Sequence, residues 1–204
     1  FNSHPLRSDV SPENYTESII KDLMQYRHTL QDREIQTVFF GGGTPSLLSL
    51  KQLEKILSTF QRQSWGPVGE WTVECNPATV SKDKAELLKQ AGVNRISMGV
   101  QSLDPDLLDR LGRIHSRDQV FRSFDILRSA GFENINLDLM FGIPTQTMAQ
   151  WQSTLDEITE MKSDHISCYE VIYEEDTALY RQLKAGEFDI DEELAAEMYE
   201  ALIL

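Results

Sequence analysis

Short runs of apolar residues alternate along the chain with longer stretches in which apolar residues recur at helical spacing. The short runs have the length and the aromatic and β-branched content of strands. They lie at residues 37–40, 71–74, 95–100, 135–140 and 165–169. The stretch 50–60, between the first two runs, carries its apolar residues on one side of a helix. Five strands with intervening helices predict an α/β fold built from parallel βα units.

Capping residues mark where the intervening helices begin and end. Ser81 stands where an N-cap is expected, and the pairs Ala91-Gly92 and Ala130-Gly131 are typical of helix ends just before a strand. No linker divides residues 1–174, which we expect to form one domain core. Residues 175–204 are acidic and helical. We expect this segment to lead to a C-terminal domain that is absent from the chain.

The composition fits one globular core in a reducing compartment. Of the 204 residues, 40% are apolar, and 33 acidic against 19 basic side chains give a formal net charge of −14. That charge disfavours nucleic acids and anionic membranes as partners, and no run of about 18 apolar residues predicts membrane insertion. Cys75 and Cys168 stand far apart, which favours neither a disulfide framework nor a zinc site. We therefore expect a cytoplasmic protein that binds proteins or small molecules.

Three successive glycines follow the first predicted strand, in the sequence Gly41-Gly42-Gly43-Thr44-Pro45. Glycine leaves the main-chain polar groups open to a ligand, and parallel βα folds bind ligands at the carboxyl ends of their strands. The alternative is a tight strand-to-helix turn that holds no ligand. The segment lacks the Gly-Lys-Ser/Thr of a phosphate-binding loop and the spacing of a dinucleotide fingerprint.

Two carboxylates and an amide stand at the ends of the following strands, at Glu74, Gln101 and Asp138. A carboxylate in an otherwise apolar strand requires a cationic or hydrogen-bonding partner, because an unpaired charge is costly to bury. Besides a ligand, three arginines offer an internal ion pair, namely Arg95, Arg113 and Arg117. Together, these strand ends predict a pocket able to hold an ammonium, a carboxylate and ribose hydroxyls.

Five segments in a row resemble the motifs of one protein family. They are residues 40–46, 73–77, 92–102, 111–115 and 136–144. In this order they resemble the radical S-adenosylmethionine (radical SAM) family that contains oxygen-independent coproporphyrinogen III oxidases and related heme chaperones. The resemblance implies a partial (β/α)6, TIM-like barrel. It places the first barrel strand upstream, so that this chain carries strands two to six.

The resemblance also assigns contacts to the cofactor. The contacts to the methionine end of S-adenosylmethionine are Gly42, Gly43 and Thr44. The remaining contacts are Glu74, Gln101, Arg113 and Asp138, with Ile172 supplying backbone contacts to adenine. In chemical terms, Arg113 suits the methionine carboxylate, whereas Glu74 and Asp138 suit the ammonium or ribose hydroxyls. The family allows one or two S-adenosylmethionine molecules in this region.

The iron-sulfur cluster that such proteins use has no ligands in this sequence. Radical SAM chemistry requires three cysteines, spaced Cys-x3-Cys-x2-Cys, to hold a [4Fe-4S] cluster. Residues 1–4 resemble the segment that begins two positions after the last of these cysteines. Cys75 and Cys168 belong to separate strands and cannot replace three clustered thiolates. As written, the chain cannot assemble the cluster.

Three short stretches favour the heme-chaperone branch of the family. Phe1 stands where the oxidases carry a fourth cysteine, and residues 1–4, 112–115 and 167–170 resemble the chaperones more than the oxidases. The resemblance then implies binding of heme and S-adenosylmethionine and transfer of heme to an acceptor protein. Two alternatives stay open: a coproporphyrinogen III oxidase acting by radical decarboxylation, and a scaffold without catalytic activity. The sequence leaves undecided whether the protein is an enzyme.

Overall fold

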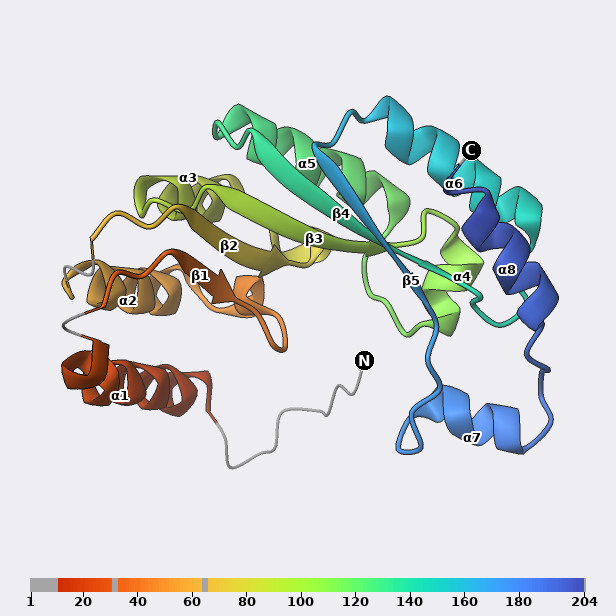
Figure 1. Ribbon diagram of the computed structural model, residues 1–204, viewed down its shortest axis with the longest axis horizontal. Helices are drawn as coiled ribbons and strands as arrows, with labels where there is room; N and C mark the ends of the chain where they lie inside the picture. Colours follow the sequence, from red (N-terminus) through yellow and green to blue (C-terminus); the bar gives the residue numbers. More distant parts are fainter. Residues whose placement is uncertain (1–10, 31–32, 64–65, 204) are drawn as a thin grey trace.

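The computed structural model describes residues 11–30, 33–63 and 66–203. Its centre is a sheet of five parallel strands that follow one another in chain order (Figure 1). The strands are β1 (Thr37–Phe40), β2 (Glu70–Cys75), β3 (Arg95–Gln101), β4 (Asn134–Phe141) and β5 (His165–Glu170). All five predicted strands are confirmed, each to within one residue at either end. Within the described residues the sheet is open, with β1 and β5 at its edges.

A helix lies in each crossover between neighbouring strands. The helices are α1 (Pro12–Leu30), α2 (Leu50–Gln61), α3 (Lys82–Gln90), α4 (Pro105–Arg110), α5 (Arg117–Ser129), α6 (Met148–Glu160), α7 (Ala178–Lys184) and α8 (Glu192–Glu200), with two 3-10 turns, η1 (Pro45–Leu47) and η2 (Pro77–Thr79). The predicted N-cap Ser81 is confirmed at the start of α3. Ser49, Ser116 and Thr147 begin α2, α5 and α6 with capping boxes, which fix where these helices start. Among the described residues, no helix is long and apolar enough to cross a membrane.

The two faces of the sheet differ in chemistry, because side chains alternate between the faces along each strand. On the outer face, Val73, Ile96 and Leu137 are buried in the main apolar core together with residues of the helices. Helices α3, α5 and α6 lie on the same side of the sheet (Figure 1). The opposite face, called the inner face below, is largely polar. Its polar residues are Thr72, Glu74, Arg95, Ser97, Asn136, Asp138 and Ser167, and Phe39, Met140 and Tyr169 share this face by register and alternation.

The acidic C-terminal segment folds back onto the core. Helix α8 contacts α6 and β4, and Met198 on this helix is fully buried. The indole nitrogen of Trp151 on α6 donates a hydrogen bond of 2.8 Å to the main-chain oxygen of Met198. The expected division of the chain after residue 174, and the domain expected to follow, stay predictions.

Thr145, in the loop after β4, carries backbone strain that a substitution can remove. Its φ is +68° although it is β-branched, and its side chain is exposed. We expect Thr145→Gly to raise the free energy of unfolding by about 1 kcal/mol, because glycine adopts this conformation without steric cost. Urea denaturation measures the change. Lys162→Gly is the control, since exposed Lys162 has a φ of +54° without β-branching and should gain less. A loss of stability in Thr145→Gly would contradict the assignment of strain.

Candidate functional site

The glycine turn after β1 needs glycine for two separate reasons. Gly42 and Gly43 have φ values of +76° and +81°, in the left-handed region that favours glycine. At Gly41, a Cβ would come within 2.2 Å of Phe39 and 2.9 Å of the Glu74 carboxyl. The amide of Gly42 donates a hydrogen bond of 3.1 Å to Glu74 Oε2. The turn is therefore held against the end of β2, with the backbone of Gly42 and Gly43 exposed.

Thr44 closes the glycine turn and stands at the N-cap of η1. Its backbone is extended, and its hydroxyl makes no capping hydrogen bond. The hydroxyl is therefore not used to hold η1. Thr44 thus lies with Gly42 and Gly43 at the carboxyl end of β1, as the sequence predicts.

Asp138 is fixed by a hydrogen-bond network that crosses the inner face. Ser97 Oγ donates to Asp138 Oδ2 at 2.9 Å, and Asn136 Nδ2 donates to Asp138 Oδ1 at 2.7 Å. Asn136 Nδ2 also donates to Ser97 Oγ at 2.8 Å, while Asn136 Oδ1 accepts from Ser167 Oγ and His165 Nδ1. All four hydrogen-bonding positions of the buried Asn136 amide are thus used. The network joins β3, β4 and β5 and orients the Asp138 carboxyl.

The carboxyls of Glu74 and Asp138 lie in positions where binding of a cation would be favourable. Burial raises the pKa of Glu74, the hydrogen bond from Gly42 opposes this, and the charge of Asp138 adds to the rise. Burial also raises the pKa of Asp138, against the hydrogen bonds from Ser97 and Asn136 and the charge of Arg95. The ionised form of each group is thus less favourable than in water. A ligand ammonium or hydroxyl at this position would offset that cost.

Arg113 follows α4 and lies within the field of Asp138. Burial lowers the pKa of Arg113, and the charge of Asp138 opposes this shift. Asp138 thus acts on both Glu74 and Arg113, which places the three charged groups within electrostatic reach of one another; that they line one cofactor pocket stays a prediction. Arg117, the third arginine considered for an internal ion pair, instead contacts Glu157 through a hydrogen bond of 2.8 Å from its Nε.

Gln101 ends β3 in an unusual conformation. It is 3% exposed with a φ of +68°, at a point where the register between β3 and β4 shifts. A Cβ built on Gly99 would lie 3.0 Å from Gln101 Nε2, so the amide occupies the space that a side chain at Gly99 would fill. Gly99 is the register partner of Asp138. Gln101 therefore lies beside the acidic group at the carboxyl ends of the strands.

Ile172 and His115 stand apart from this group. Ile172 lies just beyond β5, and its side chain is 73% exposed. Its expected backbone contacts to adenine stay a prediction. His115 is buried, and its Nε2 donates a hydrogen bond of 2.9 Å to the main-chain oxygen of Val100. This contact favours a structural role for His115.

The cysteines do not fit an iron-sulfur cluster. Burial raises the pKa of Cys75 to about 12 and that of Cys168 to about 11, so both are poor sources of thiolate. They belong to β2 and β5, which are not neighbours in the sheet. Within the described part of the chain, no three His, Cys, Asp or Glu side chains are grouped to hold a metal ion. Residues 1–4, which resemble the segment after the cluster cysteines, lie outside the described residues.

The fold agrees with what comparison with known proteins finds. The family model of the radical SAM superfamily matches residues 3–158, and the chain belongs to this superfamily. Membership implies S-adenosylmethionine and a [4Fe-4S] cluster as cofactors.

The curated relatives include heme chaperones. The chain is 36% identical over 206 residues to the heme chaperone HemW of Bacillus subtilis (strain 168), covering 100% of this chain and 54% of that protein. It is 38% identical over 178 residues to HemW of Escherichia coli (strain K12), covering 87% and 47%. The chain thus spans about half the length of these relatives.

A solved structure confirms the predicted fold class. Coproporphyrinogen III oxidase (HemN) from Escherichia coli, described as a radical SAM enzyme, superposes with a TM-score of 0.88 at 22% identity. The superposition covers 99% of this chain and 47% of that one. The open five-stranded parallel sheet is therefore a partial, TIM-like radical SAM barrel.

Proposed function

We propose that this chain is the S-adenosylmethionine-binding part of a heme chaperone. The identity of 36% to 38% with HemW proteins carries the proposal, because it extends over most or all of the chain. The site supports it with an exposed glycine turn next to two partly buried carboxyls and an arginine. In this proposal, the whole protein binds heme and passes it to an acceptor protein.

The described residues suit separate parts of S-adenosylmethionine. The cofactor presents an ammonium, a carboxylate, ribose hydroxyls and adenine. The main chain of Gly42 and Gly43 is accessible to the methionine end, together with Thr44. Glu74 and Asp138 accept hydrogen bonds from the ammonium or the ribose hydroxyls, and Arg113 binds the carboxylate. Gln101 is a further cofactor contact, and the backbone of Ile172 contacts adenine. The thiolates of the cluster must come from outside this sequence, which has two cysteines.

A coproporphyrinogen III oxidase is the second candidate, and the structural likeness to HemN favours it. At 22% identity this likeness establishes the fold alone. Unpaired Cys75 and Cys168 support a cytoplasmic location for either candidate, because reducing compartments keep thiols free.

One experiment separates the candidates. The full-length natural protein is reconstituted anaerobically with iron and sulfide, and three quantities are measured: heme binding by absorbance titration, S-adenosylmethionine binding by equilibrium dialysis, and decarboxylation of coproporphyrinogen III. We expect binding of heme and S-adenosylmethionine with little decarboxylation. Stoichiometric decarboxylation of coproporphyrinogen III would overturn the proposed chaperone function in favour of the oxidase. If the protein binds neither heme nor S-adenosylmethionine, the remaining candidate is a scaffold without catalytic activity.

A further inference from the structure

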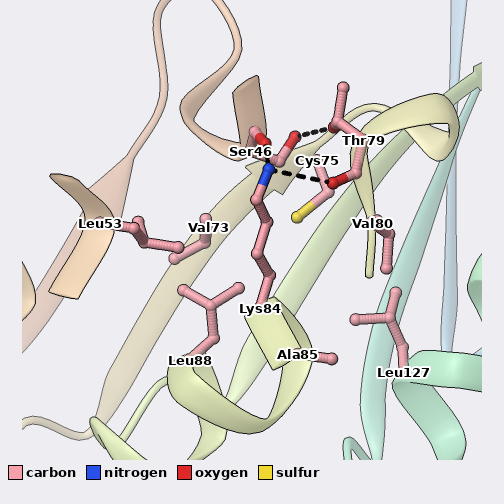
Figure 2. Close-up of a pocket in the computed structure, with 10 residues that line it drawn as sticks. All are labelled: Ser46, Leu53, Val73, Cys75, Thr79, Val80, Lys84, Ala85, Leu88 and Leu127. Carbon is pink, nitrogen blue, oxygen red and sulfur yellow. Dashed lines mark hydrogen bonds between the residues drawn. The ribbon is translucent and has the colours of Figure 1, made fainter. Parts of the chain in front are cut away.

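Behind the glycine turn, one lysine joins the loops that follow β1 and β2. The turn η1 follows the glycines directly, and η2 follows the end of β2. Lys84 extends from the first turn of α3 toward both (Figure 2). Its Nζ donates to the main-chain oxygen of Ser46 at 2.6 Å and to that of Thr79 at 3.4 Å. The ammonium therefore bridges η1 and η2.

Two buried or half-buried hydroxyls reinforce the bridge. Thr79 Oγ1 donates to the main-chain oxygen of Asn76 at 2.8 Å, which uses its only proton. Ser46 Oγ is therefore the donor in its hydrogen bond with Thr79 Oγ1. Ser46 Oγ also accepts from the amide of Asn76 at 3.0 Å. Ser46, two residues after Thr44, is thus held to the segment that begins two residues after Glu74.

The stem of Lys84 has little room to move. It borders a cavity of about 10 Å³ whose other walls include Val73, Leu88 and Leu127 (Figure 2). Such a volume is at the lower limit for one water molecule. The stem therefore packs along apolar groups while its charged end reaches the two carbonyls, as lysine side chains commonly do.

The ammonium of Lys84 lies in a partly buried position, where it is less well solvated than in water. Burial lowers the pKa of Lys84, which means that the charged form is less favoured here than in water. Its hydrogen-bond partners are main-chain carbonyls, which carry no full negative charge. A cation whose pKa is perturbed by burial, close to a strand-end site, is a candidate for a functional role.

We propose that Lys84 is a positioning residue for the cofactor: by joining Ser46 to Thr79 it keeps the glycine turn in register with Glu74. Gly42 stands four residues before Ser46, and Glu74 stands two residues before Asn76, so the two segments that the bridge joins are those that carry the contact between Gly42 and Glu74. This inference rests on the proposed binding of S-adenosylmethionine at the turn.

The test compares Lys84→Met, which keeps the length of the stem without the charge, with Lys84→Arg, which keeps a cation. In the reconstituted full-length protein, equilibrium dialysis gives the Kd for S-adenosylmethionine. We expect Lys84→Met to raise the Kd about tenfold, as for loss of a hydrogen bond to a charged group, and Lys84→Arg to stay within about threefold. The melting temperature of Lys84→Met should stay within about 3 °C of the wild type.

Two further measurements separate positioning from a purely structural role. Lys82→Met is the matched control, because Lys82 lies on the same helix and its exposed side chain pairs with Glu86, and its Kd should not change. In the absence of cofactor, the Asn76 amide of Lys84→Met should exchange its hydrogen about tenfold faster than that of the wild type. The amide donates to Ser46 Oγ, and the lost bridge no longer orders Ser46.

The outcomes distinguish this inference from the proposed function. If the wild type binds S-adenosylmethionine and Lys84→Met binds it equally well, the inference is overturned and the proposed function stands. A loss of affinity that follows a large fall in melting temperature, or one that Lys84→Arg does not restore, also overturns it. If the wild type does not bind the cofactor, the proposed function fails and the inference fails with it, even if the exchange rate rises.

Discussion

Replacing Gly43 by valine is expected to weaken S-adenosylmethionine binding by about tenfold to a hundredfold. The φ of Gly43 is +81°, and valine in this region costs about 1–3 kcal/mol, which the turn relieves by changing conformation. A Cβ on Gly43 meets no atom within 4 Å, so the effect comes from the backbone and from bulk in the expected cofactor position. Equilibrium dialysis with the reconstituted full-length protein measures the change.

Gly186→Val provides the control for this substitution. Gly186, between α7 and α8, has a φ of +73° and equally open surroundings, but it does not lie at a strand end. The two variants should lose similar stability, whereas Gly186→Val should keep its affinity for the cofactor. Equal affinities in Gly43→Val and the wild type would remove the glycine turn from the cofactor site.

Asp138→Asn is expected to change stability and binding in opposite directions. Burial raises the pKa of Asp138 above its value in the unfolded chain. The contribution of this carboxyl to stability is therefore fully present below the unfolded pKa, where the group is protonated. It is lost as the pH rises through the folded pKa, because the carboxyl then ionises in a partly buried position. At about pH 7 the neutral amide should therefore make the protein more stable than the wild type, and the difference should vanish in acid. Affinity for S-adenosylmethionine should fall about tenfold to a hundredfold, through loss of hydrogen bonds to a charged group.

Asp164→Asn is the matched control with the opposite sign. Although partial burial acts to raise it, the pKa of Asp164 is lowered by its hydrogen bond from the Ile135 amide and by Arg128. Its stabilising effect is present above the unfolded pKa and is lost as the pH falls through the folded pKa. Asp164→Asn should therefore be less stable than the wild type at about pH 7, with unchanged cofactor affinity. Urea denaturation at several pH values measures the stability of both variants, and equilibrium dialysis measures their affinity for the cofactor.

Lower stability of Asp138→Asn than of the wild type at neutral pH would contradict the prediction, because it would show that the Asp138 carboxylate is net stabilising.

The strands could be predicted closely because their signal is local. Each apolar run is bounded by a capped helix end or a polar strand end. Two residues separate each of the pairs Ala91-Gly92 and Ala130-Gly131 from the strand that follows, and both glycines have a positive φ. The parallel order of the strands follows from a helix in every crossover. The convergence of Glu74, Arg113 and Asp138 could also be predicted, because neighbouring parallel strands end at one edge of the sheet.

The groups that hold the site could not be predicted in the same way. Asn136 stands two residues before Asp138, so the alternation of β4 indicates a shared face, but its partners come from β3 and β5. Lys84 appears in the sequence as one more polar residue in the first turn of a helix. Its contacts to Ser46 and Thr79 depend on how far α3 lies from two loops, which is a property of packing. No local sequence pattern predicts the positive φ of Thr145 either.

The order of the strands has a consequence for how the chain acquires its structure. Among the residues that the structure describes, each strand pairs with its neighbours along the sequence, so none of these pairings has to wait for a distant segment. The sheet can grow outward from any adjacent pair by closing one helix-containing crossover at a time, and the entropy cost of closure rises only slowly with the length of the crossover. During synthesis, β1 and β2 can pair before β5 has left the ribosome. Folding of this chain can therefore proceed in the direction of translation, one βα unit after another.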